Sequence, residues 1–169
     1  MTKILKRIIP FIILLLLFIQ VVSAQYLKSN KKGLSASLQS NQMGIVFPIW
    51  VSNNSAIVPH FSALWVEDAG TDYAVGLSYR KYRHKNSSVH PYFGIGASLV
   101  GLTIKDEDAI IDYIFGVNSG AEYFFSDQFS IGIEAQLNVS KSDYQSLRFG
   151  NPGGLNLNTG SILLATIYY

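Results

Sequence analysis

The chain has 169 residues, of which 49% are hydrophobic and only 14% charged, well below the charged fraction of about 25% that is typical of soluble domains. It contains no cysteine, which excludes disulfides, thiolate metal sites and a cysteine-linked lipid anchor. The formal charge of +2 gives no sign of the basic surface that nucleic-acid binding requires.

Residues 1–24 have the three parts of a secretory signal peptide. A basic start precedes an apolar run, and the small-residue motif Val-Ser-Ala follows as a cleavage site. A retained membrane anchor is the alternative, but the apolar run is short and the cleavage motif follows it directly. We therefore expect cleavage before Gln25. Residues 25–169 then form one domain with ten basic and eleven acidic side chains.

Apolar and polar residues alternate along most of this domain. Successive side chains of a strand point to opposite faces, so the alternation predicts strands with one apolar and one polar face. In chain order, we expect eight strands over residues 33–40, 43–51, 58–67, 72–83, 89–102, 110–124, 128–140 and 159–169. Pro48 interrupts the second strand and suggests a bulge, because proline cannot donate to the ladder. The third strand has the weakest pattern, since Leu64 and Val66 fall on its polar side.

The seventh strand has the clearest pattern. Its apolar side chains, from Phe129 to Val139, keep one parity over about 11 residues, which is the length of a tilted strand that crosses a bilayer. After Val22, no apolar run approaches the ~18–20 residues of a membrane-spanning helix. Helical periodicity does not persist in any later window either.

The strands together predict an all-β fold, an eight-stranded antiparallel up-and-down transmembrane β-barrel. Eight consecutive strands can close without an edge, and closure pairs the backbone groups inside the membrane. The tight turn at Ser126 and Asp127 and the long polar loop over 141–157 fall at opposite ends, as expected of short periplasmic turns and longer outer loops. A soluble periplasmic β-sandwich is the architectural alternative.

The inner parity of the expected strands carries charges of both signs. These residues are Asp72, Arg80, Asp112, Glu122 and Glu134. Side chains just fill the lumen of an eight-stranded barrel, and a buried charge needs a counter-charge. We therefore expect a polar network that ties the walls together. A proton relay or ion path is the alternative.

Aromatic residues gather near the expected strand ends, where a membrane barrel has its two interfacial girdles. They are Tyr73, Tyr79, Phe93, Tyr113, Tyr123, Phe124, Phe129 and Tyr169. Stacking against a ligand is the alternative interpretation of these rings.

Catalytic chemistry has little support in the sequence. His60 and Ser62 share a strand face, but the nearby Glu67 has the opposite parity and cannot complete a triad on that face. We predict no catalytic residue, no metal site and no cofactor.

The long polar loop is the best candidate for a surface contact. It carries Tyr144, Arg148 and Phe149, and exposed aromatic and arginine side chains favour the binding of a partner. A loop that folds over the mouth of the barrel fits the same residues equally well.

Three segments resemble those of a known family. Gly-Ala-Glu-Tyr-Phe-Phe at 120–125, followed by a short turn and Ile-Gly-Ile-Glu at 131–134, looks like the penultimate hairpin of small outer-membrane β-barrel proteins of the OmpA/OmpX type. Pro-Tyr-Phe-Gly-Ile-Gly at 91–96 is similar to their fifth strand. The resemblance implies a place in the outer membrane of a Gram-negative bacterium, in contact with outer-membrane lipid.

The C-terminus carries a further part of this resemblance. Leu163, Ile167 and the terminal Tyr169 look like the signal that the barrel-insertion machinery reads during biogenesis. We therefore expect that machinery as a transient partner. We expect no nucleic acid.

These features favour a non-enzymatic, membrane-embedded scaffold that presents surface loops for adhesion, envelope integrity or partner contact. A narrow porin-like pore for small solutes is one alternative, and a hydrolase like the outer-membrane lipid A deacylases is another. Asn-Pro-Gly at 151–153 is faintly similar to a loop of those deacylases. Their His-x-Ser pair precedes that loop, however, and residues 138–148 of this chain contain no histidine.

Overall fold

The computed structural model describes residues 31–39, 42–67, 70–83, 88–104 and 108–169. The expected signal peptide, residues 1–24, lies outside this part of the chain. Within it, the strands are β1 (Gly33–Gln39), β2 (Gln42–Val46), β3 (Ile49–Ser52), β4 (Ser55–Val66), β5 (Gly70–Tyr82), β6 (Val89–Thr103), β7 (Ile110–Ser126), β8 (Phe129–Lys141) and β9 (Leu155–Tyr168). None of the described residues belongs to a helix that is long and apolar enough to cross a membrane.

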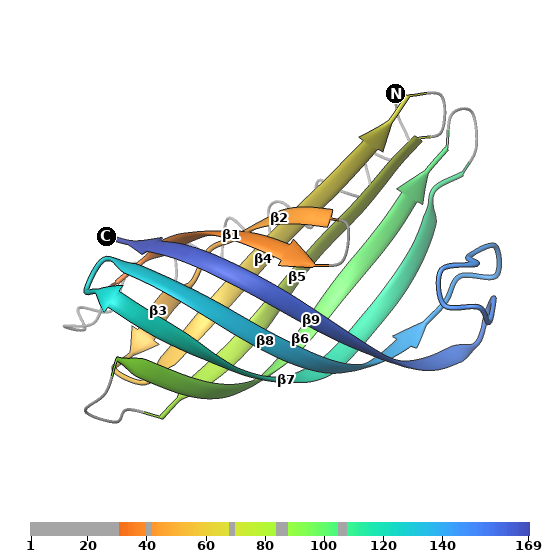
Figure 1. Ribbon diagram of the computed structural model, residues 1–169. Coiled ribbons are helices and arrows are strands. Elements are labelled where there is room, and N and C mark those ends of the chain that lie inside the picture. Colours follow the sequence, from red (N-terminus) through yellow and green to blue (C-terminus); the bar gives the residue numbers. More distant parts are fainter. Residues whose placement is uncertain (1–30, 40–41, 68–69, 84–87, 105–107) are drawn as a thin grey trace.

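The strands form one closed antiparallel sheet (Figure 1). Apart from β2 and β3, strands that follow one another in the chain pair with each other, and β1 closes the barrel against β9. The short strands β2 and β3 both pair with β4, and together they occupy the position of one strand in the barrel wall. The predicted eight-stranded antiparallel up-and-down barrel is thus confirmed.

Pro48 separates β2 from β3, where the sequence suggested a bulge. The break lies beside a second proline, and the Phe47 amide donates to the carbonyl oxygen of Pro59 at 2.9 Å. The carbonyl oxygen of Pro48 accepts a hydrogen bond from the Gly33 amide at 2.8 Å. Neither proline has an amide hydrogen to donate. The break between β2 and β3 places both prolines where no partner strand requires a hydrogen bond from their nitrogen atoms.

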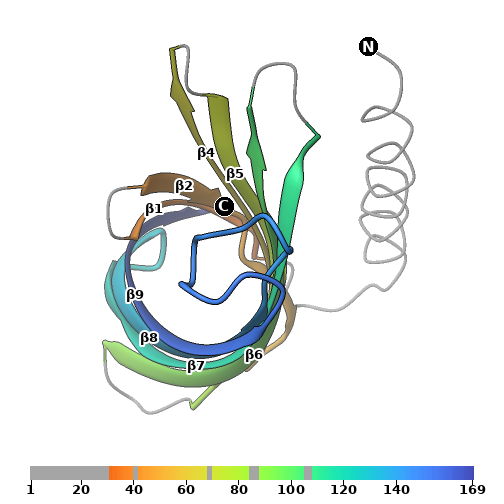
Figure 2. The same ribbon diagram turned by 90° about the vertical axis from the view of Figure 1, so that its right-hand side faces the viewer.

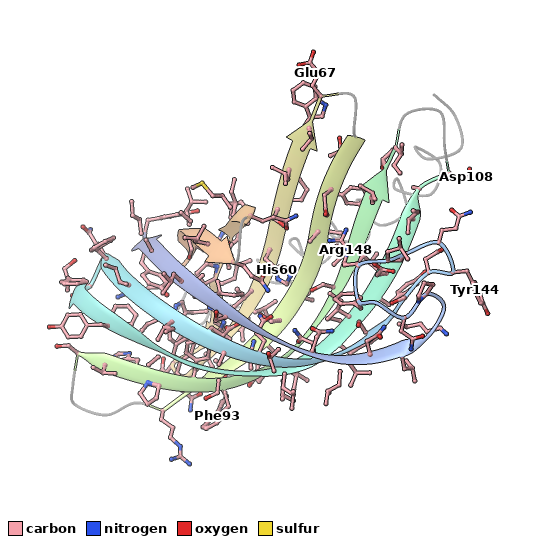
Figure 3. The ribbon with its side chains drawn as sticks, turned by 45° about the vertical axis from the view of Figure 1, so that its right-hand side comes forward. His60, Glu67, Phe93, Asp108, Tyr144 and Arg148 are labelled. Atoms are coloured by element: carbon pink, nitrogen blue, oxygen red, sulfur yellow. The ribbon has the colours of Figure 1, made fainter. Side chains whose placement is uncertain are left out.

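The outer face of the barrel is apolar. Along β8, odd-numbered residues are exposed and even-numbered residues lie inside. Ile95, Phe115 and Ile133, from three adjacent strands, are 62%, 61% and 59% exposed, and Phe93 points away from the barrel (Figure 3). An apolar surface of this extent is typical of a barrel that faces hydrocarbon.

Aromatic side chains fill the lumen at the end that holds the short turns. The Trp50 and Tyr82 rings lie 4.5 Å apart between centroids, and the Tyr82 and Tyr92 rings 4.9 Å apart. Phe124 stacks on Tyr168 at 5.5 Å, so its assignment to an outer girdle is wrong. Its even-numbered position in β7 turns it inward, whereas Tyr123 beside it is exposed.

The opposite end of the barrel is uneven. The strands β4 to β7 extend far beyond the β1–β2 hairpin (Figure 1), and the loop between β8 and β9 lies across the mouth (Figure 2). This loop is shorter than expected because β9 begins at Leu155, not at 159. The alternation already starts there, since Leu155 and Leu157 are exposed while Asn156 and Asn158 turn inward.

Candidate functional site

Arg80 lies at the centre of the lumen, between two carboxylates. Its Nη2 atom is 2.8 Å from Glu134 Oε2, and its Nη1 atom is 3.7 Å from Glu122 Oε1. All three side chains are almost fully buried. They come from β5, β7 and β8, so the ion pairs connect strands on different parts of the wall.

Hydroxyl and amide groups satisfy the remaining oxygens of these carboxylates. Glu122 accepts hydrogen bonds from the hydroxyls of Tyr82 and Tyr168, both at 2.7 Å, and of Ser130 at 3.0 Å. Glu134 accepts one from the Tyr92 hydroxyl at 2.9 Å and one from the Gln136 amide at 2.7 Å.

The Arg80 guanidinium also lies 4.8 Å from the centre of the Tyr92 ring. Buried charges are tolerated when they are paired and hydrogen-bonded in this way. We call Arg80, Glu122, Glu134, Tyr82, Tyr92 and Tyr168 the floor cluster. This cluster fills the lumen on the side of the short turns.

Two further carboxylates hold the last loop against the wall. Arg148 Nη1 is 2.9 Å from Asp72 Oδ2, and Arg148 Nε is 3.3 Å from Asp112 Oδ2. Asp112 also accepts hydrogen bonds from the Asp143 amide at 2.8 Å and the Ser146 hydroxyl at 2.7 Å. Arg148 therefore points into the barrel from the loop that crosses its mouth (Figure 3).

Two glycines with positive φ shape this loop. Gly150 and Gly153 have φ values of 74° and 67°, which side chains other than glycine rarely adopt. The Gly153 amide donates to the Asp143 carbonyl oxygen at 2.9 Å and closes the loop on itself. This fold leaves Tyr144 and Leu147 on the outside, 84% and 79% exposed.

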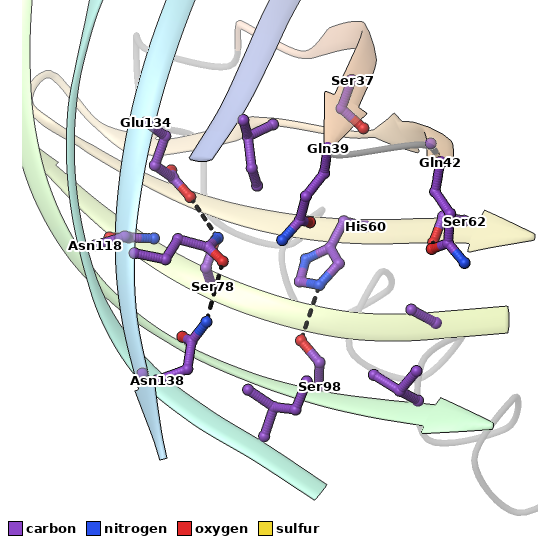
Figure 4. A pocket seen from close by; sticks show the side chains of 18 of the residues that line it. Ser37, Gln39, Gln42, His60, Ser62, Ser78, Ser98, Asn118, Glu134 and Asn138 are labelled. Carbon is purple, nitrogen blue, oxygen red and sulfur yellow. Dashed lines mark hydrogen bonds between the residues drawn. The ribbon is translucent and has the colours of Figure 1, made fainter. Parts of the chain in front are cut away.

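A cavity of about 600 Å³ lies between the floor cluster and the loop (Figure 4). Arg80 and Glu134 line one end of it, and Arg148 and Phe149 line the other. Its wall carries a mixture of polar and apolar side chains from every strand except β3. Such a volume lies within the range of small-molecule binding sites.

The inner glycines leave room for neighbouring amides in this space. A Cβ atom on Gly116 would lie only 1.9 Å from Asn138 Oδ1, and one on Gly94 only 2.1 Å from Asn118 Oδ1. A side chain at either position would therefore displace an asparagine.

The serine and histidine residues of the predicted third strand do not form a hydrolase site. His60 Nε2 lies 3.0 Å from the hydroxyl of Ser98, not of Ser62, and Ser62 donates to Gln42 Oε1 at 3.4 Å. Glu67 lies at the far end of β4, away from His60 (Figure 3). No group of three or more His, Cys, Asp or Glu side chains among the described residues could hold a metal ion.

The five charged residues expected inside the lumen do turn inward, but in two groups. Arg80, Glu122 and Glu134 meet in the floor cluster, whereas Asp72 and Asp112 bind the loop.

Of the three residues expected to form a surface contact, only Tyr144 is directed outward. Arg148 and Phe149 face the cavity. Leu147, which the sequence reasoning did not single out, is exposed beside Tyr144.

The tyrosines of the floor cluster were also missed. Their inner parity in β5, β6 and β9 is the signal that would have placed them beside the charged residues of the lumen. At the chain end, Leu163, Ile167 and Tyr169 are 53%, 60% and 73% exposed on the outer face. Their role as an insertion signal stays a prediction.

Comparison with known proteins shows the fold. No family model matches the sequence, and no curated protein does. The structure is similar to the crystal structure of Neisserial surface protein A (NspA), with 16% identity, a TM-score of 0.53, and coverage of 82% of this chain and 92% of that one. It is also similar to the N-terminal β-barrel domain of Pseudomonas aeruginosa OprF, with 12% identity, a TM-score of 0.55, and coverage of 83% and 98%.

The chain therefore has the fold of the small eight-stranded outer-membrane β-barrels. Sequence identities this low relate the folds and carry no further property of those proteins to this chain.

Proposed function

We propose that this chain is an outer-membrane β-barrel whose lumen is blocked and which serves as a scaffold for its surface loops. The observation that carries the proposal is the floor cluster. Arg80 and its two carboxylates occupy the centre of the lumen, and tyrosine rings pack around them. A solute could pass only if these buried, paired charges separated, which is costly in a low-dielectric interior.

The apolar outer face supports the membrane location. Rows of exposed Ile, Leu, Val and Phe side chains run around the barrel, and lipid is the surrounding that such rows favour. The outer-membrane proteins with the same fold support this choice of membrane.

The loop between β8 and β9 supports the scaffold role. Its inner side is fixed by Arg148 and Ser146 on Asp112, so its outer side has a defined shape. Tyr144 and Leu147 stand on that outer side. Exposed aromatic and aliphatic side chains on a rigid loop suit partner contact with little loss of conformational entropy. The carboxylates of the floor cluster are paired with Arg80 and with tyrosine hydroxyls. The role we propose is non-enzymatic.

The location and the loop can be tested together by cysteine labelling, since the natural chain has no cysteine. A Tyr144→Cys variant in intact cells should react with a membrane-impermeant maleimide. An Asp127→Cys variant, in the tight turn at the other end, should react only after the outer membrane is permeabilised. Equal labelling of both variants in intact cells would contradict the proposed topology.

The scaffold role needs a separate measurement. Cells that carry the Tyr144→Ala/Leu147→Ala variant should lose surface adhesion or partner binding while the barrel still folds. A Leu137→Ala variant on the outer face of β8 is the control. Wild-type levels of binding in the loop variant would overturn the role assigned to this loop.

A further inference from the structure

The barrel wall is incomplete on one side near its outer end. Among the described residues, the pairing of β1 with β9 ends at Leu38 and Leu163, and the pairing of β2 with β4 ends at Gly44 and Ser62. The first half of β9 therefore pairs with β8 alone, and the last residues of β4 pair with β5 alone. The edges of β9 and β4 border a gap in the wall.

This gap lies at the level of the membrane. Ile162 on the β9 edge pairs with Glu134 of β8, and Asn158 pairs with Asn138. These β8 residues alternate with Ile133, Leu137 and Val139, which belong to the exposed apolar face. The gap therefore opens sideways toward lipid.

The inner surface next to the gap is partly apolar. A lumen filled only by polar groups would not need these apolar side chains. Leu64, Val100, Ile114 and Ile162 all line the cavity, and Phe149 of the loop joins them. This arrangement explains why Leu64 breaks the alternation of its strand. An apolar side chain on the inner parity indicates that this part of the lumen accommodates hydrocarbon.

The floor cluster closes the cavity toward the short turns, and the loop fixed by Arg148 lies across part of the mouth (Figure 2). The gap between β9 and β4 offers a second route, from the side of the barrel. Gln39 and Gln42, at the end of the β1–β2 hairpin, line the cavity beside this route (Figure 4).

The polar groups of the cavity select for a particular head group. Among the charged side chains that line the cavity, Arg80 pairs with Glu134 and Arg148 pairs with Asp72, so the charges balance. A charged head group would therefore meet no free counter-charge there, and burial of an unpaired charge is costly. Uncharged hydrogen-bonding side chains also line the cavity, among them Ser37, Gln39 and Gln136, and such groups suit a hydroxylated head group.

We propose that the outer half of the lumen binds an uncharged amphiphile with one alkyl chain and a hydroxylated head group, which arrives from the bilayer through the gap between β9 and β4. The alkyl chain lies against Leu64, Val100, Ile114 and Ile162. The head group lies among the polar side chains of Ser37, Gln39 and Gln136. This site goes beyond the scaffold role and does not depend on it.

Methyl NMR of the protein in phosphatidylcholine nanodiscs tests the site. The probe is monododecanoylglycerol, titrated from below one equivalent. We expect saturable shifts of the methyl groups of Leu64, Val100, Ile114 and Ile162, because they face the cavity. The methyl groups of Ile95 and Ile133 face lipid and should stay in place. Non-saturable shifts, or shifts of the outward methyl groups alone, would overturn the proposal.

Two adjacent positions of β7 offer matched variants. Ile114→Trp places an indole inside the cavity and should weaken binding at least tenfold, whereas Phe115→Trp changes the lipid-facing side and should leave binding unchanged. Ser98→Leu fills less of the cavity and serves if Ile114→Trp does not fold. Equal affinity in the inward and outward variants would refute the site.

The head-group assignment has its own test. Dodecanoate and dodecyl phosphate carry the same alkyl chain with an anionic head, and we expect each to bind at least tenfold more weakly than monododecanoylglycerol. Equal affinity for the anionic probes would overturn the assigned ligand class. None of these outcomes alters solute conductance or loop labelling, so failure here is distinguishable from failure of the scaffold role.

The route can be tested with a single cysteine. An Ile162→Cys variant should react faster with a bilayer-partitioned pyrene maleimide than with a charged, water-soluble maleimide. Faster reaction with the water-soluble reagent would show access through the mouth instead and would contradict the lateral route.

Discussion

Arg148 lies 2.9 Å from the carboxylate of Asp72, and this contact fastens the last loop to β5, a strand that is not its neighbour in the sheet. The same guanidinium reaches Asp112 on β7. Both pairs lie at the barrel mouth, where about a quarter of the Arg148 side chain is exposed. One side of the loop is thus fixed to the barrel wall at the mouth, and the other side faces outward.

The first prediction concerns this attachment. Arg148→Ala leaves Asp72 and Asp112 without their cation, so we expect the loop to leave the mouth more often. Hydrogen exchange at the amides of Asp143 and Ser146 should become faster by about tenfold, which corresponds to about 1.4 kcal/mol. Tyr144→Ala is the control because this side chain points outward, and it should leave exchange unchanged. Wild-type protection in Arg148→Ala would show that the ion pairs do not hold the loop.

The second prediction concerns the buried ion pairs of the floor cluster. Arg80→Ala leaves Glu122 and Glu134 buried without a counter-charge, and removal of one partner of such a pair costs about 3–5 kcal/mol. Arg80→Lys should recover only part of this stability, since one ammonium group cannot reproduce the forked contact with two carboxylates. Urea unfolding in lipid vesicles, followed by tryptophan fluorescence, measures the difference. Unchanged unfolding of Arg80→Ala would remove the structural role assigned to Arg80.

The third prediction concerns the two tyrosine hydroxyls that meet on Glu122. Tyr82→Phe and Tyr168→Phe each remove a hydrogen bond to a charged acceptor, which is worth about 1.5–3 kcal/mol. The double variant should not lose the sum, because both hydroxyls serve the same carboxylate. Tyr113→Phe on the outer face is the matched control and should have no effect. Strict additivity would indicate that the two bonds act independently.

Much of the barrel could be predicted because strand alternation has a fixed period. In β8, polar and apolar residues switch at every step, so both the face and the length of the strand follow from the sequence. The alternation of Leu155, Asn156, Leu157 and Asn158 carried the same signal in β9. The asparagines hid this signal because asparagine is common in loops. β9 therefore starts earlier than expected.

The site was less predictable because it depends on which inner residues meet across the lumen. Parity places Arg80 and Glu134 inside, but the distance between β5 and β8 depends on barrel closure, which no local pattern contains. The position of Arg148 is a stronger case. An arginine in a polar loop has the composition of a surface residue, and only the folded loop brings it to Asp72.

The fourth prediction concerns the lipid-facing wall. Ile133→Arg places a charge in the middle of the apolar face of β8, which costs about 2–4 kcal/mol at the midplane of a bilayer. We expect a smaller folded fraction in vesicles. Leu147→Arg adds the same charge on the exposed side of the loop and should fold normally. Equal folding of the two variants would place the β8 face outside the hydrocarbon.

Single-channel recording in planar bilayers tests the blocked lumen most directly. The wild-type barrel should insert without conductance steps, because the floor cluster fills the lumen between the two mouths. An Arg80→Ala/Glu122→Ala/Glu134→Ala variant removes the cation together with both of its carboxylates, so none of these charges remains buried without a partner. This variant should show small discrete conductance steps. Steady ion conductance through the wild-type barrel, equal to that of the variant, would contradict the scaffold account and favour a pore.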